Sequence, residues 1–124
     1  IRQISHISLK THSINNVINF YIKILGFKIS HKFINKKKEI YGLFIYCGNR
    51  TLLEFFLNNT KKKIKAYFFE VKKIRQLAKK LKKFDKNIKV KRGKTDYVLQ
   101  FMTQDFDKNL IEFHEFDKKS KLKF

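Results

Sequence analysis

The chain lacks several residues that would place it in other protein classes. It has no proline and no tryptophan, only four glycines, and a single cysteine among its 124 residues. With Cys47 alone, no intramolecular disulfide can form, so a disulfide-stapled secreted scaffold is excluded and a cytoplasmic location is expected. We interpret Cys47 as a small core residue. No apolar stretch reaches the ~18 residues needed to cross a bilayer, so we expect no membrane partner.

Acidic residues are also scarce, and the charge balance is strongly positive. Ten aspartates and glutamates stand against 30 lysines and arginines, which gives a formal net charge of +20 and a pI near 10.1. A polyanion-binding module is therefore one alternative, because clustered cations release counterions from nucleic acid. Only four of the basic residues are arginine, the residue that nucleic-acid readers favour for bidentate contacts. We favour codon bias from an AT-rich genome instead and expect no specific nucleic-acid partner.

The remaining composition is that of a folded protein. Hydrophobic residues make up 43% of the chain and aromatic residues 15%, with 14 phenylalanines, which is ample for a core. A length of 124 residues is typical of one compact domain. We expect one domain over residues 1–117, followed by a basic, solvated tail over residues 118–124.

The hydrophobic pattern runs through the same order of elements twice. In the first half we expect a strand, a helix capped by Ser13 and ended by Gly26, and then three strands. These strands cover residues 4–10, 27–33, 39–47 and 51–57. The second half predicts the same order, with a helix whose apolar stripe ends at Phe84. Its strands are expected over residues 64–71, 88–91, 97–103 and 109–116.

Each half closes with a glutamate among large apolar residues. Glu54 lies in the segment Leu-Leu-Glu-Phe-Phe, and Glu112 lies in Leu-Ile-Glu-Phe. Desolvating such a carboxylate costs on the order of several kcal/mol unless a cation or hydrogen-bond donors compensate it. A metal ion is one such cation, and salt bridges to the abundant lysines are the alternative. Taken alone, His6 in the first expected strand is more typical of a packed, hydrogen-bonded histidine than of a metal ligand.

Taken together, these features resemble the vicinal oxygen chelate superfamily, the group of glyoxalases, bleomycin-resistance proteins and extradiol dioxygenases. The resemblance covers residues 3–116 and is nearest to small bacterial proteins like glyoxalase I. It rests on Ile-Ser-His-Ile at 4–7, Phe-Tyr at 20–21, Leu-Gly-Phe at 25–27, Phe-Glu-Val at 69–71 and Asp-Phe-Asp-Lys-Asn-Leu-Ile-Glu at 105–112. It implies an α+β fold of two βαβββ modules, over about 3–58 and 63–116, whose curled mixed sheets surround a cavity. A homodimer and a small-molecule substrate are also implied.

The resemblance further implies one divalent metal ion, such as Zn, Ni, Mn or Fe, held by the first and last strands of both modules. Carried over to this chain, the ligands are His6, Glu54 and Glu112. The fourth family position, usually histidine, falls on Ala66, which has no donor atom. His114 lies two residues beyond Glu112, on the same strand face, and is a candidate for the missing nitrogen.

Catalytic and substrate-binding roles follow from the same resemblance. Glu112 would be the base that moves a proton between adjacent carbons of a hemithioacetal, with Glu54 as its partner. Asn58 matches an asparagine that binds thiol-conjugated substrates in glyoxalase I, and Lys10 stands where that enzyme usually has arginine. The cations of the segment 91–97, Arg92 and Lys94 among them, would bind a substrate carboxylate. The expected substrate contacts are therefore Lys10, Asn58, Arg92 and Lys94.

Three functions remain open beside a glyoxalase-like lyase. The first is a metal-free protein that sequesters a small molecule, as bleomycin-resistance members do, and Ala66 favours this alternative. The second is another reaction of the superfamily, such as thiol transfer to an epoxide antibiotic or ring-cleaving oxygenation. The third is the polyanion-binding module. The set of His6, Glu54 and Glu112 argues against the first alternative, and it fits poorly with the two histidines and one glutamate that ring-cleaving oxygenases typically need.

Overall fold

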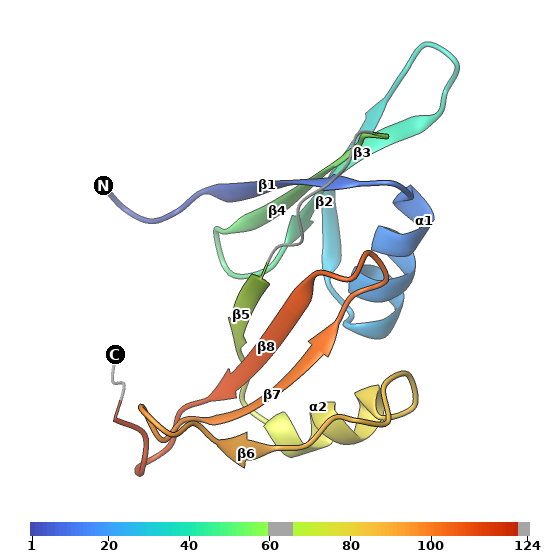
Figure 1. Cartoon of the computed structure of the whole chain (residues 1–124). Coiled ribbons are helices and arrows are strands. Elements are labelled where there is room, and N and C mark those ends of the chain that lie inside the picture. Colours follow the sequence, from blue (N-terminus) through green and yellow to red (C-terminus); the bar gives the residue numbers. More distant parts are fainter. Residues whose placement is uncertain (60–65, 122–124) are drawn as a thin grey trace. The chain divides into compact units, whose positions relative to one another are not determined.

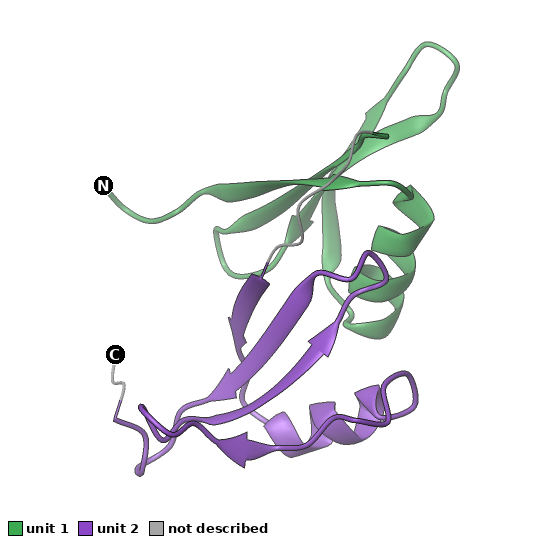
Figure 2. Cartoon of the chain, viewed as in Figure 1, with its two compact units in different colours: residues 1–63 green, residues 64–124 purple. Residues whose placement is uncertain are grey.

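A computed structural model describes residues 1–59 and 66–121 of the chain. The chain divides into two compact units, residues 1–63 and residues 64–124, which Figure 2 colours separately. Each unit holds a four-stranded mixed sheet and a helical segment, in the order strand, helix, strands (Figure 1). The expected α+β fold of two modules is confirmed. In the part of the chain that the structure describes, no helix is long and apolar enough to cross a membrane.

In unit 1, the first strand lies beside the last. The spatial order of the sheet is β1-β4-β3-β2, with β1 parallel to β4 and the other neighbours antiparallel. This places the two strands expected to carry His6 and Glu54 next to each other. The strands are β1 (His6–Thr11), β2 (Lys28–Ile34), β3 (Ile40–Tyr46) and β4 (Leu52–Leu57).

The helix of unit 1 begins and ends where the sequence predicts, but its pitch changes along the way. The Ser13 hydroxyl accepts a hydrogen bond of 3.2 Å from the backbone N–H of Asn16, as an N-cap residue does. After one turn of α1 (Ile14–Val17), the segment η1 (Ile18–Ile24) is a π-helix. Gly26 then ends the helix with φ of 78°, a backbone conformation that glycine adopts without strain.

Unit 2 repeats this plan with a regular α-helix. Its sheet order is β5-β8-β7-β6, with β5 parallel to β8. The helix α2 (Ile74–Leu81) has no cap from its own N-cap side chain; instead the Glu115 carboxylate accepts the N–H of Ile74 at 2.9 Å. The strands are β5 (Ala66–Glu70), β6 (Lys91–Arg92), β7 (Leu99–Gln104) and β8 (Leu110–Glu115). Residues 64 and 65 of the expected first strand lie outside the described residues.

Three expectations for unit 2 differ from the structure. The helix ends at Leu81, so Phe84 lies beyond its apolar stripe and is 57% exposed. The strand expected over 88–91 is reduced to Lys91 and Arg92, although Ile88 is buried. The tail was expected to be solvated, but Ser120 is buried and its hydroxyl contacts Asp117, which accepts several hydrogen bonds from the turn that follows it. A short polar turn satisfies its own backbone here, which hydropathy alone does not reveal.

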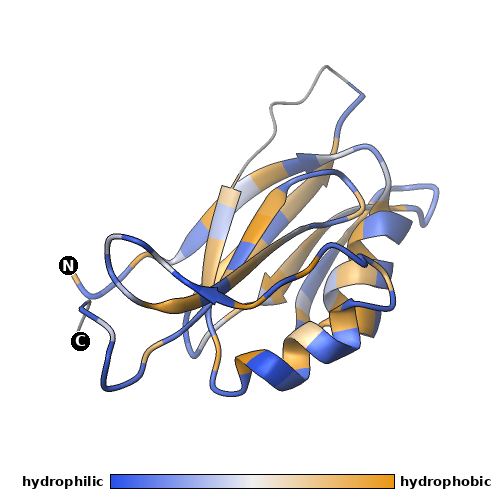
Figure 3. Cartoon of the chain, turned by 60° about the horizontal axis from the view of Figure 1, so that its bottom comes forward, coloured by the Kyte–Doolittle hydropathy of each residue, from blue (hydrophilic) through white to orange (hydrophobic). Residues whose placement is uncertain are grey.

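Alternation along each strand separates two faces of each sheet, and the strands in Figure 3 are accordingly banded in hydrophilic and hydrophobic colours. One face packs against the helix of its unit and forms the core. In unit 1, Leu43, Ile45 and Phe55 on this face are fully buried. The opposite face carries the alternate residues, including His6 and Glu54. The two expected metal ligands of unit 1 therefore lie on the face away from its helix.

A buried aspartate holds the turn between β7 and β8. Asp105 Oδ1 accepts the backbone N–H groups of Asp107 and Asn109 at 2.9 and 2.8 Å, and Asp105 Oδ2 accepts the Asn109 side-chain amide at 2.8 Å. Within this turn Lys108 has φ of 65°, in the left-handed region. A residue with a Cβ is strained there by roughly 1 kcal/mol.

Lys108→Gly is therefore expected to stabilise the protein. Relief of the left-handed strain exceeds the extra unfolded-state entropy of glycine, for a net gain of up to about 0.5 kcal/mol and a rise in Tm of up to roughly 3 °C. Thermal unfolding followed by circular dichroism measures this. Lys89→Gly, at an exposed position of ordinary φ, is the matched control and is expected to lower Tm slightly. Equal changes in the two variants would contradict the strain argument.

Candidate functional site

A histidine and a glutamate meet on the open face of the unit 1 sheet. Glu54 lies opposite Ser8 in the parallel pairing of β4 and β1, and His6 lies opposite Leu52. This register brings His6 Nε2 to 4.0 Å from Glu54 Oε2. The Glu54 side chain is 13% exposed, and that of His6 is 44% exposed. A carboxylate that is mostly buried thus faces a partly exposed imidazole.

The second nitrogen of this histidine also has a partner. Ser5 Oγ lies 2.8 Å from His6 Nδ1 and accepts a hydrogen bond from it in the neutral tautomer that carries the proton on Nδ1. In that tautomer Nε2 carries a lone pair directed to the Glu54 side. The ring also packs edge-on against Phe44, with ring centroids 5.4 Å apart. Such support fixes the orientation of an imidazole ligand.

Aromatic rings cover the rest of this face. The Phe33 ring contacts Phe44 and Phe56, with centroids 5.4 and 5.2 Å apart, and Tyr41 stacks on Phe56 at 6.3 Å. Phe44 lies opposite Glu54 in the pairing of β3 and β4. The His6 and Glu54 pair is therefore bordered by an apolar surface on which a flat or apolar molecule could rest.

In unit 2, Glu112 and His114 lie on the same face of β8. Ile111 and Phe113, the residues between and before them, are buried on the opposite face. Glu112 Oε2 is 3.1 Å from His114 Nε2, and the two side chains are 13% and 14% exposed. Within the described residues, His114 Nε2 is buried and makes no hydrogen bond.

Register shows that Ala66 is the counterpart of His6. His6 is the first residue of β1 and lies opposite Leu52, two residues before Glu54. Ala66 is likewise the first residue of β5 and lies opposite Leu110, two residues before Glu112. The equivalence of the two modules, inferred from family resemblance, thus agrees with the strand pairing of this chain. Unit 2 has a methyl group where unit 1 has an imidazole.

Salt bridges to lysine were the alternative explanation for the two buried glutamates. Among residues 1–59 and 66–121, the ionisable groups found within 4 Å of Glu54 and Glu112 are histidines, His6 and His114 respectively. The same residues contain no cluster of three or more His, Cys, Asp or Glu side chains placed to hold a metal ion. Each unit by itself therefore offers one nitrogen and one carboxylate.

The substrate contacts expected on unit 1 lie at one end of the β1 and β4 pair. Lys10 is opposite Phe56 on the same strand as His6, and Asn58 follows β4 directly. The backbone N–H of Asn58 donates to the carbonyl oxygen of Thr11 at 2.9 Å, which extends the pairing by one residue. Both residues therefore stand at fixed positions relative to Glu54.

The other two expected substrate contacts, Arg92 and Lys94, belong to unit 2. The Arg92 guanidinium donates to both carboxylate oxygens of Asp117, at 3.1 and 2.6 Å, and to the carbonyl oxygen of Tyr97 at 2.8 Å. These hydrogen bonds from Arg92 hold the pKa of Asp117 far below its usual range. Lys94 is exposed in the turn before β7. A substrate carboxylate at Arg92 would thus have to displace Asp117, a competitor that the sequence did not reveal.

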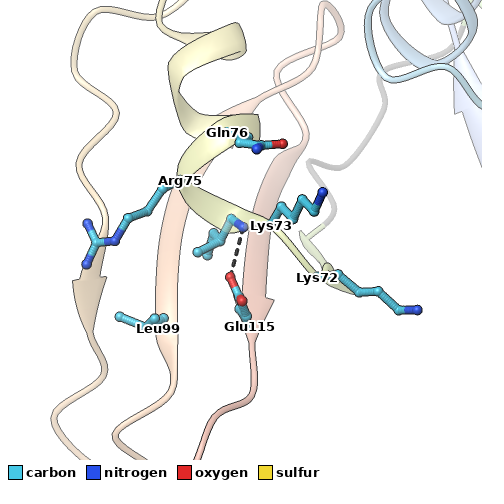
Figure 4. Close-up of a pocket in the computed structure, with 7 residues that line it drawn as sticks. Lys72, Lys73, Arg75, Gln76, Leu99 and Glu115 are labelled. Carbon is cyan, nitrogen blue, oxygen red and sulfur yellow. Dashed lines mark hydrogen bonds between the residues drawn. The ribbon is translucent and has the colours of Figure 1, made fainter.

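A cavity at the start of α2 was not foreseen. It has a volume of about 250 Å³ and is bordered by Lys72, Lys73 and Arg75 as well as by apolar atoms of Ile74 and Leu99 (Figure 4). Glu115 lies in its wall and is already bound to the N–H of Ile74. The two consecutive lysines before the helix were the sequence signal for this cationic border, but they are indistinguishable from the many other lysines of the chain.

Cys47 is half-buried, and its thiol donates to the carbonyl oxygen of Thr51 at 3.4 Å. Burial raises the pKa of this thiol, which lowers the thiolate fraction at neutral pH. These properties fit a structural cysteine better than a nucleophile.

Comparison with known proteins agrees with this architecture. Residues 3–113 match the family model described as Glyoxalase/Bleomycin resistance protein/Dioxygenase superfamily. A glyoxalase family protein from Enterococcus faecalis is 20% identical, with a TM-score of 0.69 over 93% of this chain and 98% of that chain. No curated protein matches the sequence.

Two further solved structures share the fold at lower identity. A lactoylglutathione lyase from Agrobacterium tumefaciens is 14% identical, with a TM-score of 0.72 over 96% of both chains. An antibiotic-binding protein from a Streptomyces species is 15% identical, with a TM-score of 0.70 over 94% of this chain and 98% of that chain. At these identities the likeness concerns the fold alone.

Proposed function

Because the chain belongs to the glyoxalase, bleomycin-resistance and dioxygenase superfamily, we propose that it is a metal-dependent lyase or isomerase of the glyoxalase I type. Its substrate would be a small thiol-conjugated molecule, or another molecule with oxygens on adjacent carbons. One observation carries the proposal: His6 Nε2 and Glu54 Oε2 face each other at 4.0 Å, and Glu112 occupies the equivalent register position in the second module.

The donor atoms fit a divalent metal ion. With bonds of about 2.0–2.2 Å to nitrogen and oxygen, two ligands of one ion lie roughly 3.0–4.3 Å apart, depending on the angle between them. At 4.0 Å the pair formed by His6 and Glu54 lies near the long end of this range, so the exposed His6 side chain would move toward Glu54 by roughly half an ångström to reach a tetrahedral angle at the ion. Glu112 would be the third ligand. One imidazole and two carboxylates suit Zn, Ni, Mn or Fe and leave coordination positions for substrate oxygens.

The ion would polarise the substrate oxygens and stabilise the negative charge that develops on them. Residues of the chain would transfer the proton and bind the substrate. Glu112 would take a proton from one substrate carbon and return it to the neighbouring carbon, with Glu54 as its partner in this proton transfer. Lys10 and Asn58 would bind the distal, anionic part of the substrate, with Lys94 as a further cation. A homodimer is proposed on family grounds.

Metal removal tests this function. The hemithioacetal of methylglyoxal and glutathione is converted in a reaction that is followed by ultraviolet absorbance. Protein stripped with a chelator is expected to lose at least about 90% of its activity, and added Zn, Ni, Mn or Fe(II) is expected to restore it. Buffer with the same metals but without protein is the control. Equal rates with stripped and reloaded protein, or no conversion by either, would refute the proposal.

The second candidate is a metal-free protein that binds a small molecule. Two observations favour this candidate. Alanine at position 66 cannot serve as the fourth metal ligand of the family. The aromatic face formed by Phe33, Phe44 and Phe56 suits an apolar ligand. The fold likeness to an antibiotic-binding protein supports this candidate. Saturable quenching of tyrosine fluorescence by a planar antibiotic, unchanged by chelator, would favour this candidate over the lyase.

A further inference from the structure

The pair formed by Glu112 and His114 has a geometry that an ordinary hydrogen bond does not explain. The two atoms are only 3.1 Å apart, yet the buried Nε2 makes no hydrogen bond in the described residues. At that distance a ring N–H directed at the oxygen would form one, so the oxygen lies away from the axis along which the ring nitrogen points. A buried ring nitrogen without a hydrogen bond lacks the partner that its burial requires, and a cation bound by both the nitrogen and the neighbouring carboxylate would supply it.

A shared metal ion would also hold the oxygen off the axis of the ring nitrogen. When nitrogen and oxygen bind one ion at about 2.1 Å each and lie about 3.1 Å apart, the ion forms the apex of a triangle. The oxygen then lies roughly 40° away from the axis of the ring nitrogen. The same distance corresponds to an angle of about 95° at the ion, between the octahedral and tetrahedral values.

The surroundings favour such a pair. Phe68 lies opposite Glu112 on β5, and its ring meets His114 edge-on with centroids 5.7 Å apart. The Phe116 ring lies 6.3 Å from the same imidazole. Both polar side chains are about seven-eighths buried between these rings. Apolar walls weaken hydration, so a carboxylate there gains more from a cation than it would on an open surface.

We propose that His114 is a metal ligand and, with Glu112, forms a two-donor chelate that supplies the nitrogen missing at Ala66. This inference rests on the proposed function, because it takes Glu112 as a ligand. The proposed nitrogen differs from the family ligand in its position along β8. The family position, Ala66, pairs with Leu110, two residues before Glu112. His114 lies two residues after Glu112 and pairs with Glu70. The nitrogen would approach the Glu112 carboxylate from the opposite side.

The donor types also set the choice of metal. An imidazole raises affinity for Zn, Ni and Cu more than for Mn or Mg, which prefer oxygen ligands. A site that includes His114 is therefore expected to bind Zn and Ni more tightly than Mn. Removal of the imidazole is expected to reduce this preference.

Zinc titration of the full-length protein against a competing chelating dye tests the inference. His114→Ala is expected to weaken zinc binding by at least about tenfold, and His31→Ala, which removes an exposed histidine of unit 1, is expected to leave it unchanged. In a nitrogen-15 NMR spectrum, zinc is expected to shift the His114 Nε2 resonance. Circular dichroism and Tm confirm that each variant is folded, and His114→Gln provides a second variant that keeps a polar side chain.

The same titration separates this inference from the proposed function. If His6→Ala, Glu54→Gln and Glu112→Gln weaken binding but His114→Ala and His114→Gln do not, His114 is not a ligand and the proposed function stands. If Glu112→Gln and His114→Ala weaken binding while His6→Ala and Glu54→Gln have no effect, the chelate stands and the proposed ligand set fails. No zinc binding by the wild-type protein overturns both.

Discussion

Ala66→His is expected to raise the affinity of the protein for Zn or Ni by about 10–100-fold. The side chain would start from the first position of β5, which matches the position of His6 on β1. Ala66 is exposed, so a larger side chain meets no packed core. The backbone there already pairs with β8 as β1 pairs with β4, and the substitution adds a donor without a change of register.

Competitive titration with a chelating dye measures this gain. Ala66→Gln adds a side chain of similar length with a poor metal donor and is the matched control, for which no gain is expected. In a His114→Ala background the gain from Ala66→His is expected to be larger, because the new imidazole would then replace a missing one. An unchanged affinity in both backgrounds would show that position 66 does not face the metal.

Glu112→Gln is expected to lower kcat/KM for a hemithioacetal by about 10²–10⁴-fold. The substitution keeps the shape of the side chain but removes its charge and its ability to accept a proton. The effect on rate is expected to persist at saturating metal, because a base and not only a ligand is lost. Steady-state kinetics at several metal concentrations separates the two contributions.

Glu70→Gln provides the control for this variant. Glu70 is an exposed acid on β5, on the same face of the same sheet, so its loss changes the local charge by the same amount. We expect it to change kcat/KM less than threefold. Wild-type rates for Glu112→Gln at saturating metal would exclude Glu112 as the base and leave Glu54 as the candidate.

Much of the fold could be predicted because the sequence carries strong local signals. Alternation marked β1, Ser13 marked the helix start, and Gly26 marked the helix end. The π-helical pitch of η1 was not predicted, since an apolar stripe is compatible with either pitch over two turns. Phe84 fitted the stripe by spacing, but the helix ended one turn earlier, so this residue is exposed.

The site was harder to predict, because its decisive features are pairings between distant residues. Sequence identified Glu54 and Glu112 as buried acids that needed partners, and left lysine and metal as alternatives. The family resemblance offered His6 and His114 as neighbours, and the structure adds the distances of 4.0 Å and 3.1 Å that the two histidines keep from Glu54 and Glu112. In the same way, no sequence pattern indicated that Asp117, the last residue of the expected domain, binds the Arg92 guanidinium. Long side chains reach partners that no spacing rule identifies.

The most direct test of the central claim is the metal content of protein purified without chelator. Elemental analysis is expected to find close to one Zn, Ni, Mn or Fe per chain in the wild-type protein, and less than about a tenth of that in Glu54→Gln. His6→Ala is expected to behave in the same way. Wild-type protein that holds no metal, even after incubation with excess divalent ions, would contradict a metal-dependent function and favour a metal-free binding protein on the same fold.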